Sequence, residues 1–273
     1  EAVPERPAEP ARRRRILLAD DNRINQRVFS RILEGAGHSV LLAETGDAAL
    51  DILADEADQI DLVLMDFNMP ETDGLEATKL YRMMATGGPR LPIVGLTADA
   101  TALKDQRWRE AGMDDCLIKP VEPEALLVAV DRLARDGAGS TGGNVTRLSL
   151  VRPEPPPYRD ERAIENLERL GGSAFVIELM EDYLADAEVM LGRLAESATA
   201  GDVTAFRSDA HALQSSSANI GALALGRVCA PWKDVRGEEL RAGAAAFAWR
   251  AKAELKRTQK AMRAYSAREA GLG

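Results

Sequence analysis

The sequence predicts an α/β part that contains a five-stranded parallel sheet, followed by an all-α part that forms a helical bundle. In the first half, short apolar runs of strand length alternate with longer amphipathic segments. This alternation is typical of a parallel sheet with helices on both faces. In the second half no run of strand length appears, and apolar residues recur at the three- and four-residue spacing of one helix face.

Each element of the α/β part follows from this alternation. The five apolar runs expected to be strands are residues 16–19, 40–43, 62–65, 93–96 and 116–118. The five amphipathic segments expected to be helices are about 24–35, 46–56, 74–85, 100–111 and 123–134.

A Gly/Ser-rich and then Pro-rich stretch at residues 136–158 divides the chain. Such a composition is typical of a flexible linker that becomes stiffer toward its end. We therefore expect a first domain at 15–135 and a second at 159–266. Residues 1–14 are rich in Pro, Glu and Arg and do not begin with Met, which indicates a linker and a piece of a longer protein.

The second domain is expected to be an antiparallel four-helix bundle, because long amphipathic segments are joined by short turns that contain Gly. One face of the third segment carries apolar or small residues at Val203, Phe206, Ala210, Leu213, Ser217 and Ile220. The five helical segments are expected at about 160–170, 173–199, 202–220, 222–235 and 238–265.

Composition excludes several classes of protein. The chain has 35 Lys and Arg residues against 44 Asp and Glu, a formal net charge of −9, so we expect no nucleic-acid partner. No apolar run approaches the roughly 20 residues that a membrane helix needs, so we expect no membrane contact in this segment. The two cysteines, Cys116 and Cys229, have no metal-site spacing, and they fit a reducing cytoplasm rather than a disulfide scaffold.

Charged or hydroxyl side chains follow four of the five predicted strands. They are Asp20 and Asp21, Asp66, Thr97 and Lys119. Ligands of open parallel sheets bind beyond the carboxyl ends of the strands. Any one of these aspartates alone would be interpreted as a turn residue or helix cap. Together, three carboxylates need a cation, and Mg²⁺ is the natural one, while the lysine and threonine suit a phosphoryl group carried on an aspartate.

These strand ends resemble those of the receiver domains of two-component signalling. The matching stretches are Leu17–Asn22, Met65–Pro70 with Asp73–Gly74, Leu96–Ala98 and Ile118–Pro120. The resemblance covers about 120 residues and implies a doubly wound, flavodoxin-like sheet.

The resemblance also implies roles for the acidic residues. Asp66 would accept the phosphoryl group. Asp21 and Asp66 would bind Mg²⁺ directly, together with the backbone carbonyl of Asn68, and Asp20 would act through water.

The remaining strand-end residues would hold the phosphoryl oxygens in such a domain. These are Thr97 and Lys119, and the Lys119–Pro120 peptide is expected to be cis. Many receivers carry Tyr or Phe three residues before the lysine, where this chain has Cys116. The aromatic part of the family's activation switch is therefore not expected in its usual form.

His211 lies on the third helical segment of the second domain, and helical periodicity points it away from the apolar seam and into water. By itself it would be an ordinary surface histidine. The stretch around it resembles the active helix of histidine phosphotransfer (Hpt) domains, matching at His211, Leu213, Ser216, Ser217 and Gly221. Gln214 stands where Lys is usual and Ser215 where Gly is usual. Gln214 can still donate a neutral hydrogen bond to a phosphoryl oxygen.

Together the two resemblances imply a segment of a phosphorelay, the C-terminal part of a hybrid sensor histidine kinase. A kinase histidine, expected elsewhere in the same full-length protein, would phosphorylate Asp66. The phosphoryl group would pass to His211 and then to an aspartate of a separate response regulator. No ATP-binding motif is visible, so the chain alone is not expected to use ATP, although its parent would be a kinase.

Two other functions stay open at this point. A receiver can act as a docking scaffold that phosphorylation modulates. An aspartyl-nucleophile phosphatase would also use Asp66, but those enzymes need a second acid two residues later, where this chain has Asn68. The segment is expected in the cytoplasm, with a parent that could be an inner-membrane sensor.

Overall fold

The computed structural model describes residues 13–85, 89–98, 106–135, 160–232, 234–269 and 271. The linker predicted at 136–158 and the start of the helix predicted at 100–111 lie outside these residues, so the proposed domain boundaries stay predictions.

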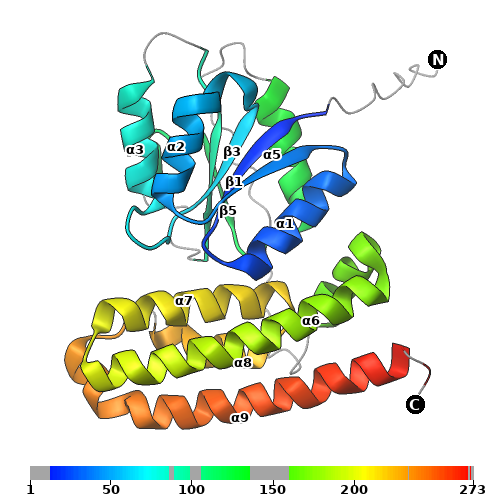
Figure 1. Ribbon diagram of the computed structural model, residues 1–273, viewed down its shortest axis with the longest axis vertical. Helices are drawn as coiled ribbons and strands as arrows, with labels where there is room; N and C mark the ends of the chain where they lie inside the picture. The colour runs from blue at the N-terminus through cyan, green and yellow to red at the C-terminus, as the bar shows by residue number, and fades with distance from the viewer. Residues whose placement is uncertain are drawn as a thin grey trace, which may run out of the picture.

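The first half of the chain forms a parallel five-stranded sheet with the strand order β2-β1-β3-β4-β5 (Figure 1). The strands are β1 (Arg15–Ala19), β2 (Ser39–Ala43), β3 (Leu62–Asp66), β4 (Ile93–Thr97) and β5 (Asp115–Ile118). Every residue of the central strand β3 and of its neighbour β4 is buried. This confirms the predicted doubly wound sheet, whose strands read as near-continuous apolar runs because helices cover both faces.

Helices cover the sheet on both sides. They are α1 (Arg23–Gly35), α2 (Gly46–Glu56), the 3₁₀ turn η1 (Ala57–Gln59), α3 (Gly74–Met84), α4 (Arg107–Glu110) and α5 (Pro123–Arg135). The apolar residues of α1 and α5 share one cluster with Ile16 and Leu18, whereas those of α2 and α3 pack against Leu17. Successive strand residues point to opposite faces, which explains this division.

The second half is a bundle of long helices (Figure 1). The elements are α6 (Glu161–Ala200), α7 (Val203–Asn219), α8 (Leu223–Cys229), the 3₁₀ turn η3 (Ala230–Trp232) and α9 (Gly237–Glu269). The break predicted at Gly171–Gly172 is a kink within α6, where Gly172 has φ 74°. The segment predicted at 222–235 is shorter than expected, because the helix stops at Cys229.

The predicted apolar seam of α7 is confirmed. Five of its six residues, Phe206, Ala210, Leu213, Ser217 and Ile220, are buried, and Val203 is half-buried. The Phe206 ring packs edge-on against the rings of Trp232 and Phe247 at centroid distances of 5.9 and 5.4 Å, so α7, η3 and α9 share one aromatic cluster.

The two halves contact each other through α1, which lies against α6 and α7 (Figure 1). Arg27 forms ion pairs with Glu178, at 3.1 Å, and with Asp182. Arg31 Nε donates a hydrogen bond to the carbonyl of Leu170 at 2.9 Å. Both guanidinium groups also lie over the Phe175 ring. Helix α9 lies on the far side of the bundle from the sheet (Figure 1). Among the described residues, no helix is long and apolar enough to cross a membrane.

Candidate functional site

Three carboxylates meet where strands β1 and β3 end. Oxygen atoms of Asp20, Asp21 and Asp66 lie within 4.8 Å of one another. Asp20 and Asp66 are 0 % and 1 % exposed, and Asp21 is half-buried. The two strands are neighbours and parallel, so the residues that end them must come together. The structure thus confirms that the sequence-predicted aspartates form one cluster.

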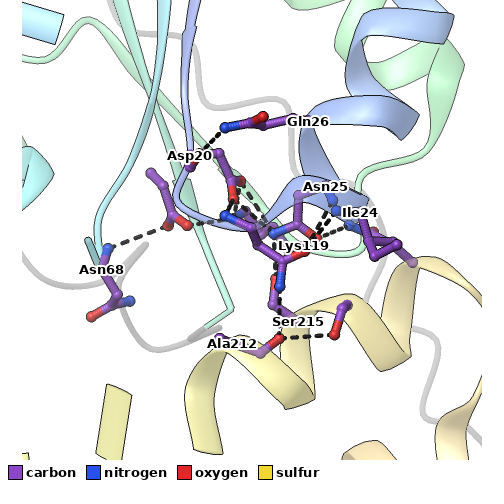
Figure 2. Close-up of polar contacts among 12 residues, drawn as sticks. Asp20, Ile24, Asn25, Gln26, Asn68, Lys119, Ala212 and Ser215 are labelled. Atoms are coloured by element: carbon purple, nitrogen blue, oxygen red, sulfur yellow. Dashed lines mark hydrogen bonds and ion pairs between the residues drawn. The ribbon is translucent and has the colours of Figure 1, made fainter. Parts of the chain in front are cut away.

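Lys119, at the end of β5, reaches across to this acidic cluster (Figure 2). Its Nζ donates to Asp20 Oδ2 at 2.6 Å and to Asp66 Oδ2 at 2.7 Å. Burial by itself would lower the pKa of Lys119, but the two carboxylates outweigh it and raise this pKa above its usual value. The ammonium group therefore stays charged. Thr97, at the end of β4, is also buried, and its carbonyl accepts a hydrogen bond from the Lys119 amide at 2.7 Å.

The negative charge of the acidic cluster exceeds what Lys119 balances. Burial, Asp66 and Asp20 together raise the pKa of Asp21 to about 7. Burial also raises the pKa of Asp20. Carboxylates that are hard to ionise together need a further cation, and an all-oxygen set of ligands fits a hard divalent ion such as Mg²⁺.

The turn between β1 and α1 holds Asp20 in place (Figure 2). Asp20 Oδ1 accepts hydrogen bonds from the Asn22 amide at 2.9 Å and from Asn25 Nδ2 at 3.0 Å. Gln26 Nε2 donates to the Asp20 carbonyl at 2.6 Å. Asn22 is the N-cap of α1, because its Oδ1 accepts from the amides of Ile24 and Asn25. Helix capping and orientation of the carboxylate are therefore done by the same few side chains.

The loop after β3 comes unusually close to Asp66. A Cβ atom added at Gly74 would lie 1.9 Å from the Asp66 carbonyl oxygen, so only glycine fits there. Asp73 is the N-cap of α3 and accepts from the Glu76 amide at 2.8 Å. The Asn68 amide donates to Asp66 Oδ1 at 3.3 Å, which places this exposed residue beside the acidic cluster. Helix capping explains Asp73 of the sequence motif, and the close approach to Asp66 explains Gly74.

Cys116 is buried, and burial raises the pKa of its thiol to about 12. It belongs to the apolar cluster that also contains Met65 and Met113. The Phe67 ring lies so close to Gly95 that a Cβ atom there would be 2.2 Å from it.

The expected cis peptide between Lys119 and Pro120 is confirmed.

The predicted exposure of His211 to water is wrong for one of its two ring nitrogens. The side chain does point away from the seam of α7, but it is half-buried and its Nε2 is buried rather than in water. The reason is that the turn after β1 lies against this part of α7. Asn22 Nδ2 donates to the Ala212 carbonyl at 3.1 Å, and Asn25 Nδ2 donates to Ser215 Oγ at 3.0 Å (Figure 2). The structure thus brings the histidine helix to the end of the sheet that carries Asp66.

Gln214 is half-buried on α7, three residues after His211. Its Oε1 is buried and has no hydrogen-bond partner among the described residues. A contact of Gln214 with a phosphoryl group stays a prediction.

The sequence did not predict that Asn25, Asn219 and Arg193 take part in contacts between the two halves near the acidic cluster. Arg193 of α6 donates to Asp209 at 2.6 and 2.8 Å. These hydrogen bonds are the main reason why its pKa is raised, and Asp186 and Asp21 add to the effect. A cation of the bundle therefore lies near the acidic cluster of the sheet. The hydrophobic pattern of each half does not predict a contact between the halves. The only sequence feature that pointed to one was Ser215, which departs from the Hpt motif.

Two family comparisons agree with this geometry. Residues 16–131 match the response regulator receiver domain family, and residues 178–264 match the Hpt domain family.

Relatives resemble one or both halves of the chain. The sensory/regulatory protein RpfC of Xanthomonas campestris pv. campestris is 35% identical over 211 residues, covering 76% of this chain and 28% of that protein. The sensor histidine kinase RcsC of Salmonella typhi is 44% identical over 111 residues, 41% of this chain and 11% of its own length. The sensor histidine kinase GacS of Pseudomonas protegens is 38% identical over 118 residues, which cover 42% of this chain and 13% of that protein. The chain thus spans less than a third of the length of each of these relatives.

Solved structures with a similarity to this chain each cover somewhat less than half of it. The chemotaxis protein CheY4 of Vibrio cholerae is 30% identical, covering 45% of this chain and 99% of that one, with a TM-score of 0.41. The receiver domain of the sensor histidine kinase PA1611 of Pseudomonas aeruginosa is 34% identical over the same shares, with a TM-score of 0.40. That crystal structure has a magnesium ion coordinated in its active-site cleft.

Proposed function

Because this chain is a receiver domain followed by an Hpt domain, as in hybrid sensor kinases, we propose that it performs two successive transfers of a phosphorelay. In the first transfer Asp66 accepts a phosphoryl group from a kinase histidine. In the second, His211 takes that group from Asp66 and later donates it to an aspartate of a response regulator. The observation that carries this proposal is the contact of the β1–α1 turn with α7 beside His211.

The chemistry of each step follows from the residues present. An Asp66 carboxylate oxygen attacks phosphorus, a new P–O bond forms, and the P–N bond to the donor imidazole breaks. A ring nitrogen of His211 then attacks the same phosphorus, a P–N bond forms, and the P–O bond to Asp66 breaks. No oxidant or other reactant is needed, because each step exchanges one bond to phosphorus for another.

The side chains around Asp66 lower the cost of both steps. The Lys119 ammonium, already bonded to Asp66, would balance charge on the phosphoryl oxygens, and the Thr97 hydroxyl would donate to one of them. Asp21, Asp66 and the Asn68 carbonyl would hold Mg²⁺ directly and Asp20 would hold it through water. When bound, this ion would neutralise part of the phosphoryl charge.

The partners follow from this assignment. Receiver and Hpt domains imply partners in phosphoryl transfer. The donor would be the kinase domain of the full-length protein of which this chain is a part, and the acceptor would be the receiver of a separate response regulator.

Labelling with acetyl phosphate tests the site directly. We expect Asp66 to become phosphorylated only with Mg²⁺ or Mn²⁺ present, and Asp21→Ala to abolish the labelling because a ligand of the ion is lost. The matched control is Asp51→Ala, which removes an exposed carboxylate of the same domain and should label like the unchanged chain. Equal labelling in excess chelator would contradict the assignment of Asp21 as a metal ligand.

A further inference from the structure

We propose that three side chains, Asn25 of α1 with Ser215 and Asn219 of α7, form a docking triad by which this receiver domain holds its own Hpt domain over the acidic cluster. The triad covers His211 while the two domains are docked, so a second receiver can reach His211 only after they separate. This inference rests on the proposed function and adds a specificity determinant to it.

The hydrogen bonds of the docking triad cross the boundary between the two domains. Asn25 Nδ2 donates to Ser215 Oγ at 3.0 Å, and Asn25 Oδ1 accepts from Asn219 Nδ2 at 2.7 Å. All three side chains are buried, with exposed fractions of 0 %, 2 % and 8 %. Buried polar groups are costly unless they find partners of the right geometry, so such contacts select one surface among many.

The Asn25 amide is fully used only in the docked arrangement. Asn25 Nδ2 donates to Ser215 Oγ and also lies 3.0 and 3.2 Å from the two carboxylate oxygens of Asp20 (Figure 2). The amide therefore links a carboxylate of the acidic cluster to the histidine helix.

The placement of the docking triad explains why it covers His211. Residues four apart on a helix lie on one stripe, so His211, Ser215 and Asn219 follow one another along the same side of α7. The receiver domain occupies this stripe, and any other receiver that approaches His211 would need the same surface. The burial of His211 Nε2 agrees with this cover.

The charged contacts at the edge of the interface are less selective. Arg27 and its partners Glu178 and Asp182 are half-buried or exposed, and such pairs contribute little to affinity because water screens them. Glu178 and Asp182 would attract any receiver domain with a basic α1 helix, whereas the docking triad needs a side-chain amide at the position of Asn25. Ser215 supplies the accepting oxygen at a position where glycine is usual in the Hpt motif.

Exposure of His211 to diethyl pyrocarbonate, which modifies histidine rings, measures docking without any phosphoryl transfer. In the full chain, Ser215→Ala and Asn219→Ala should each raise the modification rate of His211 about fivefold, the effect of losing one buried hydrogen bond. Ser208→Ala is the matched control, since Ser208 is an exposed serine of the same helix. Buried His38 of the receiver domain is the internal reference, and an unchanged rate there shows that the fold is intact.

The same variants are then labelled with acetyl phosphate and Mg²⁺. Ser215→Ala should lower the ratio of phosphate on His211 to phosphate on Asp66, whereas Ser208→Ala should leave this ratio unchanged. A His211 modification rate that is the same in all four chains would overturn the docking triad. Faster modification with no phosphate on His211 in any chain would support the triad and overturn the relay.

Discussion

Gln214 and His211 lie three residues apart on α7, close enough for both side chains to approach one phosphoryl group. In the Hpt motif this position usually holds lysine, whose charge would balance the oxygens during transfer. A neutral amide forms a weaker hydrogen bond to a charged acceptor than an ammonium does. If Gln214 contacts the phosphoryl group, as we propose, substitutions at this position should change the rate of transfer in both directions.

We predict that Gln214→Lys speeds the passage of phosphate from Asp66 to His211 and that Gln214→Ala slows it. Each effect should be about 1 kcal/mol in activation free energy, up to roughly tenfold in rate. The measurement is a quenched time course of labelling at the two residues, with exposed Ser208→Ala as the control. Identical rates for Lys, Gln and Ala at position 214 would show that this side chain does not touch the phosphoryl group.

At the scale of elements, the acidic cluster depends on how closely α3 begins beside the end of β3. The amide of Gly74 donates to the carbonyl of Phe67 at 3.1 Å, and its Cα faces the Asp66 backbone without room for a side chain. Asp73 then caps the helix. The position of Asp66 is therefore set by a backbone contact between two elements as well as by its own strand.

Gly74→Ala should destabilise the receiver domain by about 1–3 kcal/mol, because the new methyl group forces the α3 start away from β3. Gly35→Ala is the matched control: Gly35 is a helical glycine with nothing within 4 Å of an added Cβ atom, so its replacement should be neutral or slightly stabilising. Urea unfolding followed by far-ultraviolet circular dichroism compares the two variants. Equal unfolding midpoints would contradict the close approach at Gly74.

At the scale of the whole molecule, the sequence predicts each half well and their contact poorly. Apolar runs and helical spacing give the strands, most helices and the seam of α7, because burial imposes a period on each element. The carboxylates at strand ends follow from parallel topology. The cover on His211 depends on Asn25 matching Ser215 and Asn219, three polar residues far apart in the chain. Periodicity within one domain carries no information about such a match.

The docking of α1 on α7 also bears on the two proposed uses of the His211 surface, transfer from Asp66 and delivery to another protein. While α1 is docked, the stripe of α7 that contains His211 faces the molecule's own Asp66 end of the sheet. In the proposed relay, delivery of the phosphoryl group to another protein would require this contact to open. The order of transfers, first within the chain and then out of it, is thus the central claim about the whole molecule.

Mapping phosphate in Asp66→Asn and His211→Gln variants of the full chain tests this order most directly. After incubation with acetyl phosphate and Mg²⁺, acid-labile, base-stable phosphate reports His211, and base-labile phosphate reports Asp66. We predict that Asp66→Asn removes both signals, because His211 receives phosphate only through Asp66, and that His211→Gln leaves the Asp66 signal intact. Acid-labile, base-stable phosphate on His211 in the Asp66→Asn chain would contradict the proposed relay.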